Sequence, residues 1–243
     1  MCPFLFKMKR YDKITEKDPR EIVLLRGTGC QWKRCTFCDY HTDASSDANA
    51  NFALNSAVLD CVTGELGRLE VINSGSFVDL DAKTMQKIRD VAIAKGISAL
   101  HFECHWMHRG ALNDLRAFFA KDRIRLIFKI GVESFDIPFR ERILKKGLGN
   151  ATPEQIAAAG FEEINLLCGI DGQTASGIRA DIETGLAHFS RVCVNVMTEN
   201  TTAVRPDKKV IEAFMREVYP LYQNDQRVDI LLQNTDFGVG KRE

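Results

Sequence analysis

Short apolar runs alternate with longer amphipathic stretches along nearly the whole chain, and this alternation limits the possible folds more than any other feature. Runs of β-branched and apolar residues are typical of buried strands, and the stretches between them have helical periodicity. Repeated strand–helix units imply parallel strands joined by right-handed crossovers. The predicted strands cover 21–26, 68–73, 98–103, 124–131, 162–168, 191–197 and 228–233, and the predicted helices cover 52–63, 82–95, 110–120, 138–146 with 153–159, 174–189 and 207–222.

Six or seven such units are too few for a closed eightfold barrel, so the sequence predicts an α/β fold with an incomplete (β/α)6–7 TIM-like barrel. No Pro-, Gly- or Ser-rich linker divides the 243 residues. We therefore expect one domain over 1–243, with an N-terminal extension over 1–20. The most polar segment, 42–51, is expected to be a surface loop.

Composition favours a reduced, non-membrane setting. The apolar runs are far shorter than the roughly 20 residues that span a bilayer, and no secretory signal precedes the first strand. Eight cysteines without an export signal indicate metal ligation rather than disulfides, which predicts the cytoplasm. The 33 basic and 33 acidic residues cancel, so stable nucleic-acid binding is not expected.

Three cysteines within nine residues follow the first predicted strand. Cys30, Cys35 and Cys38 lie in a loop over 27–41 and can hold three corners of a [4Fe-4S] cluster, leaving one iron open to a small molecule. His41 follows the third cysteine by three positions, so a tetrahedral Cys3His zinc site is the alternative. Zinc modules are usually small, whereas this trio belongs to a long α/β chain, which favours iron–sulfur.

Polar side chains follow every predicted strand. In barrels of this kind, function lies at the carboxyl ends of the strands. Because polar ends around one rim are hard to explain by stability alone, this distribution predicts an enzyme. The polar ends are Gly27–Cys30, Asn73–Ser76, Glu103–His105, Gly131–Ser134, Cys168–Gly172, Thr198–Thr202 and Gln233–Asp236.

The cysteine loop resembles that of the radical S-adenosylmethionine (radical SAM) superfamily, including the aromatic Phe37 before the third cysteine. That superfamily usually has C-x3-C-x2-C, whereas this chain has C-x4-C-x2-C, so we expect a bulge over 31–34. The segments after the second and fourth strands also resemble superfamily segments. The resemblance implies a [4Fe-4S] cluster on the three cysteines and S-adenosylmethionine contacts from Tyr40, Ser74, Gly75, Ser76, Glu133, Ser134, Arg142 and Lys145.

The strand ends look like those of a branch that contains elongator-type proteins and the archaeosine synthase radical SAM component. Within it, the segments 198–202 and 233–238 are similar to the queuine lyase family. This resemblance implies cleavage of S-adenosylmethionine to a 5′-deoxyadenosyl radical, with an electron from a flavodoxin- or ferredoxin-type donor. It also implies release of 7-aminomethyl-7-deazaguanine from free queuine. The alternatives are a radical SAM enzyme acting on tRNA and a zinc-stabilised barrel that binds a ligand.

Strand parity suggests which side chains meet the substrate. In the sixth strand the valines at 192, 194 and 196 share one face and should pack against helices, so Asn195 and Glu199 point into the barrel. A deazaguanine base offers N–H groups that a carboxylate can accept together. The candidate substrate ligands are Asn195, Glu199, Asn234 and Asp236, and the candidate catalytic residues are Glu103, Cys104 and His105. Dimerisation that closes the open side of the barrel is also considered.

Overall fold

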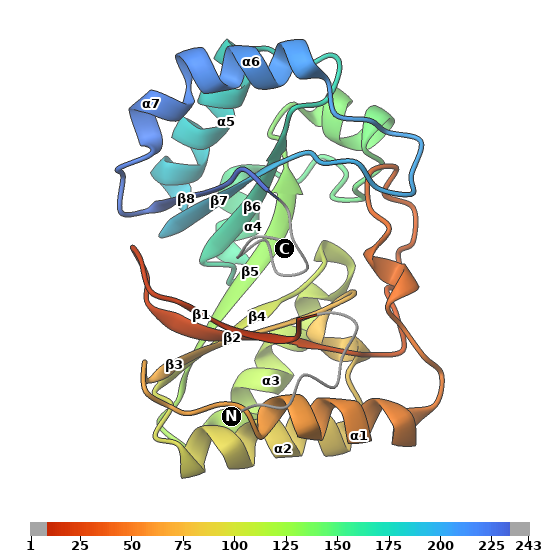
Figure 1. The fold of residues 1–243 in the computed structure, drawn as a ribbon, viewed down its shortest axis with the longest axis vertical. Helices are drawn as coiled ribbons and strands as arrows, with labels where there is room; N and C mark the ends of the chain where they lie inside the picture. Colours follow the sequence, from red (N-terminus) through yellow and green to blue (C-terminus); the bar gives the residue numbers. More distant parts are fainter. Residues whose placement is uncertain (1–8, 234–243) are drawn as a thin grey trace. The chain divides into compact units, whose positions relative to one another are not determined.

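The structure is a computed structural model, and it describes residues 9–233 (Figure 1). The chain divides into two compact units. Among the described residues, the first comprises 9–31 and 40–128, and the second comprises 32–39 and 129–233. Both units contain part of strand β5 (Arg125–Glu133), and the cysteine loop passes from the first unit to the second between Gln31 and Trp32.

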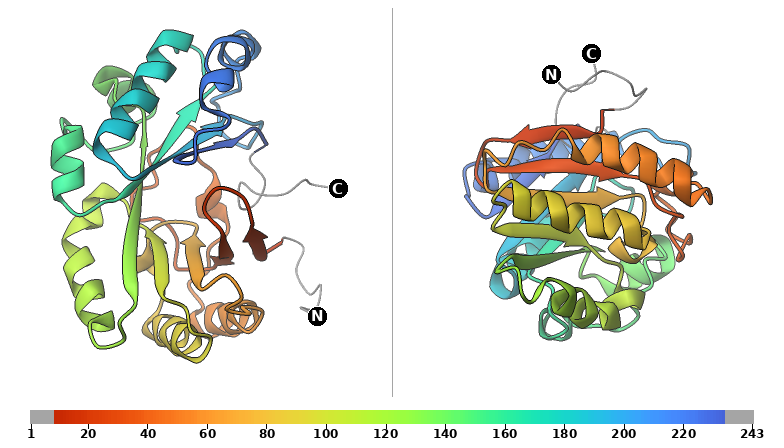
Figure 2. Two further views of the ribbon diagram at one scale, coloured as in Figure 1. Left: turned by 90° about the vertical axis from the view of Figure 1, so that its left-hand side faces the viewer. Right: turned by 90° about the horizontal axis from the view of Figure 1, so that it is seen from below.

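The first unit is a sheet covered by helices. Its strands are β1 (Tyr11–Ile14), β2 (Arg20–Leu25), β3 (Arg68–Asn73), β4 (Ala99–Glu103) and the first half of β5, in that order. β1 is antiparallel to β2, whereas β2, β3 and β4 are parallel. Helices α1 (Ala48–Leu59) and α2 (Ala82–Ala94) lie side by side along one face of the strands (Figures 1 and 2), and α3 (Leu112–Phe119) follows β4.

The second unit repeats the strand–helix pattern. The second half of β5 is followed by β6 (Glu163–Cys168), β7 (Arg191–Val196) and β8 (Val228–Leu231), all parallel and in sequence order. The helices are α4 (Pro153–Ala158), α5 (Ala175–His188), α6 (Lys208–Glu217) and α7 (Tyr219–Tyr222). A π-helical turn at Phe139–Ile143 follows β5.

The valine face of β7 packs against a helix, as strand parity predicts. A side-chain carbon on Gly185 of α5 would lie 2.7 Å from a Val192 methyl carbon, so the glycine lets the helix approach the strand closely. Val192 and Val194 are fully buried, while Asn195 on the opposite face is half-buried. This arrangement places Asn195 on the side of the strand away from α5.

Charged side chains are buried at the beginnings of the strands. In the first unit, Arg20 donates to Glu70 at 2.6 Å, and Arg68 lies 3.0 Å from the ring of His101. In the second unit, Arg191 pairs with Asp229 at 2.9 Å. Buried charges are tolerated when paired, so these contacts are structural.

Several elements differ from the sequence prediction. The predicted extension over 1–20 contains strand β1, whose half-buried YDKI sequence has no apolar run to reveal it. Helix α1 begins at Ala48, inside the predicted loop 42–51, because Asp47 caps it through the N–H groups of Asn49 and Ala50. The predicted helix 110–120 is a 3₁₀ segment at 106–111 followed by α3, 207–222 divides into α6 and α7, and 138–146 contains only the π-helical turn.

One cysteine also differs from expectation. Cys61 is disulfide-bonded, whereas the sequence analysis predicted reduced thiols. The three cysteines of the loop are not disulfide-bonded, and neither are Cys104, Cys168 and Cys193.

Candidate functional site

The first part of the cysteine loop is anchored by two asparagines of α1. Asn55 accepts from the Arg26 N–H at 2.7 Å and donates to the Arg26 carbonyl at 2.8 Å. Asn51 accepts from the Arg26 guanidinium at 2.7 Å and donates to the Ser45 carbonyl at 2.7 Å. Both asparagines are buried in a helix, where their hydrogen-bonding groups need partners. These bonds fix the point where β2 ends and the loop begins.

Asp79 connects the same loop to the turn after β3. Its backbone carbonyl accepts from the Thr28 N–H at 3.0 Å, and its carboxylate accepts from the Ser76 N–H at 2.7 Å. Gly75 of this turn has no room for a side chain, because a β-carbon there would lie 3.0 Å from the Cys30 α-carbon. The backbone of this turn therefore lies close to Cys30, and the contact of Gly75 with S-adenosylmethionine stays a prediction.

The second part of the loop lies on the segment after β5. The Trp32 indole donates to the Lys145 carbonyl at 2.8 Å, and the Thr36 hydroxyl donates to the Ile143 carbonyl at 2.7 Å. Gly147 lies against the Trp32 ring and has φ of 80°, so both space and backbone require glycine there. Lys33 adopts a left-handed φ of 48°, inside the segment 31–34 where a bulge was predicted.

Phe37 and Asp39 hold the end of the loop. Phe37 packs on a buried cluster of Leu144, Leu167, Ile170 and Met197. The Phe37 carbonyl accepts from the Asn200 amide at 2.7 Å, and the Asp39 carboxylate accepts from the Thr201 N–H and hydroxyl at 3.0 Å. The loop that carries Cys35 and Cys38 is therefore bound to the strand ends of β5 and β7. Neither Asn200 nor Thr201 was singled out as an anchor from the sequence.

The end of β5 is irregular and charged. The strand register shifts between Gly131 and Glu133, and Glu133 has φ of 66°, a left-handed conformation unusual for a side chain of this size. The Glu133 carboxylate accepts from the Lys146 ammonium at 2.8 Å. Burial alone would lower the pKa of Lys146, but the charges of Glu133, Cys35 and Cys38 raise it well above its ordinary value.

The ends of β3 and β4 are connected by hydrogen bonds. The Ser76 hydroxyl accepts from the His105 N–H at 2.9 Å, and the Ser74 hydroxyl donates to the Asp43 carbonyl at 2.7 Å. Burial, with a smaller contribution from the charge of Asp79, raises the pKa of the Cys104 thiol to about 12. Cys104 therefore keeps its proton at neutral pH, and its predicted catalytic role would have to be that of a thiol. Glu103 is half-buried at the end of β4.

The predicted cofactor residues of the second unit have different surroundings. The Ser134 hydroxyl donates to Asp181 of α5 at 2.7 Å, while the side chains of Arg142 and Lys145 are exposed. Burial raises the pKa of Asp181, and the hydrogen bonds from Ser134 and from the Phe135 N–H limit that rise. Ser134 is thus a structural partner of α5 in this conformation. In the first unit, Tyr40 is half exposed, and His41 of the zinc alternative is exposed beside it.

Of the four predicted substrate residues, the structure describes Asn195 and Glu199. Asn195 donates to the Leu166 carbonyl at 3.4 Å, and Glu199 is exposed and pairs with Arg205 at 3.5 Å. Asn234 and Asp236 lie outside the described residues. The geometry therefore leaves the substrate assignments as predictions.

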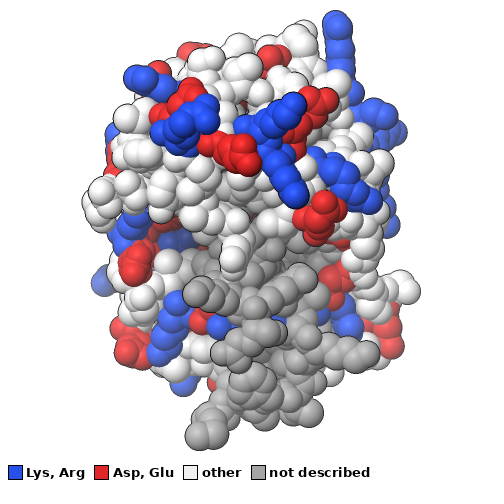
Figure 3. Space-filling view, turned by 45° about the horizontal axis from the view of Figure 1, so that its top comes forward, with Lys and Arg blue, Asp and Glu red and all other residues white. Residues whose placement is uncertain are grey.

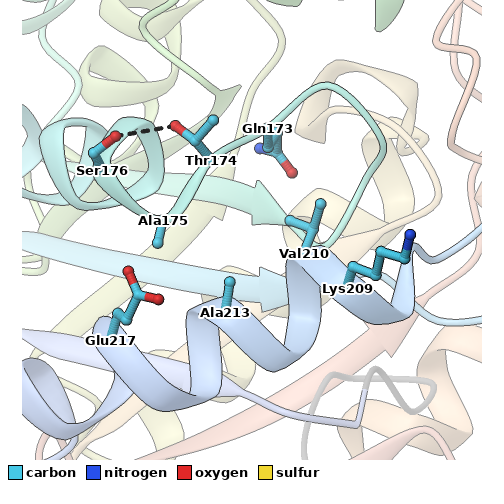
Figure 4. A pocket seen from close by; sticks show the side chains of 8 residues that line it. All are labelled: Gln173, Thr174, Ala175, Ser176, Lys209, Val210, Ala213 and Glu217. Carbon is cyan, nitrogen blue, oxygen red and sulfur yellow. Dashed lines mark hydrogen bonds between the residues drawn. The ribbon is translucent and has the colours of Figure 1, made fainter.

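A separate open groove of about 410 Å³ lies between the beginning of α5 and α6 (Figure 4). The Thr174 and Ser176 hydroxyls on its wall are 3.1 Å apart, and the Gln173 amide is engaged by the Leu167 carbonyl and the Ile170 N–H. None of the residues that line it is a predicted site residue, so we assign it no part in the chemistry of the cysteine loop.

Comparison with solved structures decides the family. A queuine lyase from Clostridium spiroforme, solved with S-adenosylmethionine and queuine bound, is 38% identical to this chain, with a TM-score of 0.90 over 97% of this chain and 100% of that one. The chain belongs to the queuine lyase family. This confirms the predicted radical SAM lyase and the incomplete TIM-like barrel. No family model matches the chain, and no curated protein matches it.

More distant structures support the fold of this queuine lyase family member. Streptococcus suis SuiB bound to S-adenosylmethionine is 13% identical, with a TM-score of 0.52 over 86% of this chain and 49% of that chain. A second SuiB structure matches with a TM-score of 0.50 over 85% of this chain and 48% of that chain. Among residues 9–233, the helices lack the length and apolar character needed to cross a bilayer.

Several residues that shape the site were not identified from the sequence. Asn51, Asn55 and Asp79 hold the first part of the loop, and Lys146 and Asn200 lie against the second. The two asparagines 51 and 55, four residues apart on one face of a largely apolar helix, were a usable signal, because such residues disfavour helix interiors unless their side chains have partners. Lys146 gave no such signal, since it lies among other basic residues at 140–146.

Proposed function

We propose that this protein releases 7-aminomethyl-7-deazaguanine from free queuine in a reaction that consumes S-adenosylmethionine. The observation that carries the proposal is the likeness to the Clostridium spiroforme queuine lyase, which covers nearly all of both chains. A match of that length includes every strand end, rather than the cysteine loop alone.

The residues of the loop fit a [4Fe-4S] cluster. Cys30, Cys35 and Cys38 are half-buried and not disulfide-bonded, and they can supply the three thiolates that such a cluster needs when one iron remains open. The Lys146 ammonium lies 5.8 Å from the centroid of the Phe37 ring, between Cys35 and Cys38 in the sequence, and would offset the negative charge of a thiolate-bound cluster. When bound, the cluster would supply the electron that cleaves S-adenosylmethionine.

The chain itself orients the cofactor and keeps the loop rigid. Gly75 gives the turn after β3 a backbone surface without a side chain, and Ser74 and Ser76 on either side are buried. Their hydroxyls are fixed by Asp43 and His105, so this turn changes little when a ligand binds. We propose that this turn contacts the methionine part of S-adenosylmethionine. The other proposed contacts are Tyr40, Glu133, Ser134, Arg142 and Lys145.

For the substrate, we propose that amide and carboxylate groups after β7 and β8 bind the base. Asn195 lies on the strand face away from α5 and has one weak bond, at 3.4 Å, so its amide can turn toward a ligand. Glu199 must leave Arg205 to accept the N–H groups of a deazaguanine, and exchange of an exposed ion pair costs little. Asn234 and Asp236 remain proposed ligands, and we propose that Glu103 and His105 face the diol.

Charge favours a small substrate over tRNA. The face drawn in Figure 3 carries Lys and Arg side chains interspersed with Asp and Glu, and the whole chain has no net charge. A phosphate backbone is normally bound by a basic excess. A flavodoxin- or ferredoxin-type donor, a homodimer and a cytoplasmic location remain parts of the proposal.

The proposal is tested by two anaerobic measurements. Purified protein should contain about four iron atoms and four acid-labile sulfides per chain, as a [4Fe-4S] cluster requires; a colourless protein with one zinc would instead support the Cys3His alternative. Reduced enzyme with S-adenosylmethionine should then act on free queuine. Release of the base only from queuosine-containing tRNA would support the tRNA-modifying alternative and contradict the proposal.

A further inference from the structure

The end of β5 builds a buried ion pair beside the cysteine loop. The Lys146 Nζ lies 2.8 Å from Glu133 Oε1, and the two side chains are only 13% and 8% exposed. The strand bulges between Gly131 and Glu133, and Glu133 has φ of 66°. Left-handed backbone at such a residue is energetically unfavourable and persists only where the surroundings impose it.

Gly131 provides the space for this pair. A β-carbon on Gly131 would lie 2.6 Å from the Lys146 Nζ and would also collide with the Glu133 carboxylate. The φ of Gly131 is not left-handed, so the backbone does not require glycine here. A β-carbon at this position would instead force the ends of the Glu133 and Lys146 side chains to move. The bulge, the glycine and the ion pair therefore form one arrangement.

The arrangement presents its cation to the loop. The Lys146 Nζ lies 5.8 Å from the centroid of the Phe37 ring, and Phe37 stands between Cys35 and Cys38 in the sequence. The hydrogen bonds of Trp32 and Thr36 hold the loop on the segment 143–145, immediately before Lys146. The Glu133–Lys146 pair therefore lies against the part of the loop that carries Cys35 and Cys38.

We propose that Lys146 is a positioning residue of the cysteine loop: its ammonium, held by Glu133 above Gly131, raises the reduction potential of the cluster on Cys35 and Cys38. This inference rests on the [4Fe-4S] cluster of the proposed function. Reduction adds a negative charge to the cluster, and a nearby cation stabilises the reduced form more than the oxidised form. The low local polarity around a buried pair strengthens this effect.

An electrostatic role makes opposite predictions for the two partners. Lys146→Gln removes the cation and should shift the midpoint potential of the cluster to a more negative value. Glu133→Gln removes the anion and should shift it to a more positive value. Lys146→Arg keeps the positive charge, so the midpoint potential of its cluster should stay near that of the wild type. A role limited to holding the fold predicts shifts of the same sign in both Gln variants, or none.

The experiment is a redox titration followed by electron paramagnetic resonance, on anaerobically reconstituted full-length protein without S-adenosylmethionine. Lys208→Gln is the matched control, because Lys208 is an exposed residue of α6 in the same unit. Its potential should equal that of the wild type. Iron content and circular dichroism are measured on each variant, and a folded Lys146→Gln protein that cannot hold iron contradicts the proposal, because Lys146 would then retain the cluster rather than set its potential.

The outcomes separate this inference from the proposed function. A wild-type protein that holds no cluster overturns both. A wild-type protein that holds the cluster and processes queuine, while Lys146→Gln and Glu133→Gln both keep its potential, overturns only the role of Lys146. If Lys146→Gln does not fold, the midpoint potentials of Glu133→Gln and Lys146→Arg test the inference instead. An unchanged potential in Glu133→Gln contradicts it.

Discussion

Asn55 satisfies both backbone groups of Arg26 at once, accepting from its N–H at 2.7 Å and donating to its carbonyl at 2.8 Å. Arg26 is the first residue after β2, and the cysteine loop begins at the next residue. One fully buried side chain of α1 thus determines where the strand stops and the loop starts.

Replacement of this amide should destabilise the protein and loosen the loop. Asn55→Ala removes the partner of both backbone groups of the half-buried Arg26, which should lower the free energy of unfolding by about 1–3 kcal/mol. Asn49→Ala is the control, because Asn49 is exposed in the same helix; it should change stability by less than about 0.5 kcal/mol. Denaturant unfolding measures both, and equal effects would contradict the anchoring role of Asn55.

A methyl group at Gly131 should be poorly tolerated because the Glu133–Lys146 pair occupies its space. The atoms in the way are the ends of two flexible side chains, which can shift, so Gly131→Ala should destabilise the protein by about 1 kcal/mol, the low end of the range for overpacked sites. Gly110→Ala is the matched change, since nothing lies within 4 Å of the position of its β-carbon. Thermal unfolding of the two variants measures the difference, and a Gly131→Ala protein as stable as Gly110→Ala would show that the pair does not need this space.

The contacts of Glu21 predict a loss of stability in acid. Burial alone would raise the pKa of Glu21, but hydrogen bonds from Thr63 and Tyr11 bring it below its ordinary value of 4.5. A carboxyl with a lowered folded-state pKa stabilises the protein above pH 4.5, and this contribution is lost as the pH falls through the folded-state value.

The change Tyr11→Phe tests this linkage. The Tyr11 hydroxyl donates to Glu21 at 2.8 Å, so its removal should raise the pKa of Glu21 toward the ordinary value. The loss of stability between pH 7 and pH 3 should then be smaller in Tyr11→Phe than in the wild type, because other carboxyls contribute equally to both. Urea unfolding measures the free energy of unfolding at both pH values. If Tyr11→Phe loses as much stability between pH 7 and pH 3 as the wild type, the result is inconsistent with the assigned bond.

Single changes of the loop cysteines should abolish cluster binding. Cys30→Ala, Cys35→Ala and Cys38→Ala each leave two thiolates, so each should lose most of its iron after anaerobic reconstitution. Cys193→Ala removes a buried thiol of β7 and should retain iron at the wild-type level. Iron analysis with the absorption spectrum distinguishes these results. Wild-type iron in Cys30→Ala would exclude Cys30 as a ligand.

The sequence predicted the strands well because their signals are local. Runs such as Arg68–Asn73 and Arg191–Val196 are apolar and β-branched, and both are strands with those or nearly those bounds. The half-buried β1 has no such pattern, and α1 begins inside a polar segment whose helix start depends on the Asp47 cap. Propensity alone does not reveal a cap.

The site could be predicted from the sequence only where its functional residues lie close together in one segment. Cys30, Cys35 and Cys38 stand out by type and spacing. Lys146 and Asn200 meet the loop only because the ends of β5 and β7 approach it in the fold, across more than a hundred residues of sequence in each case. The bulge and the left-handed backbone of Glu133 likewise depend on packing that no local pattern encodes.

The most direct test of the account is an anaerobic assay of wild-type protein with free queuine, S-adenosylmethionine and a reductant, in which mass spectrometry measures the released base. The account predicts 7-aminomethyl-7-deazaguanine, formed only when S-adenosylmethionine is present and absent with Cys35→Ala. Unchanged queuine in the presence of protein that carries a full cluster and binds S-adenosylmethionine would contradict it.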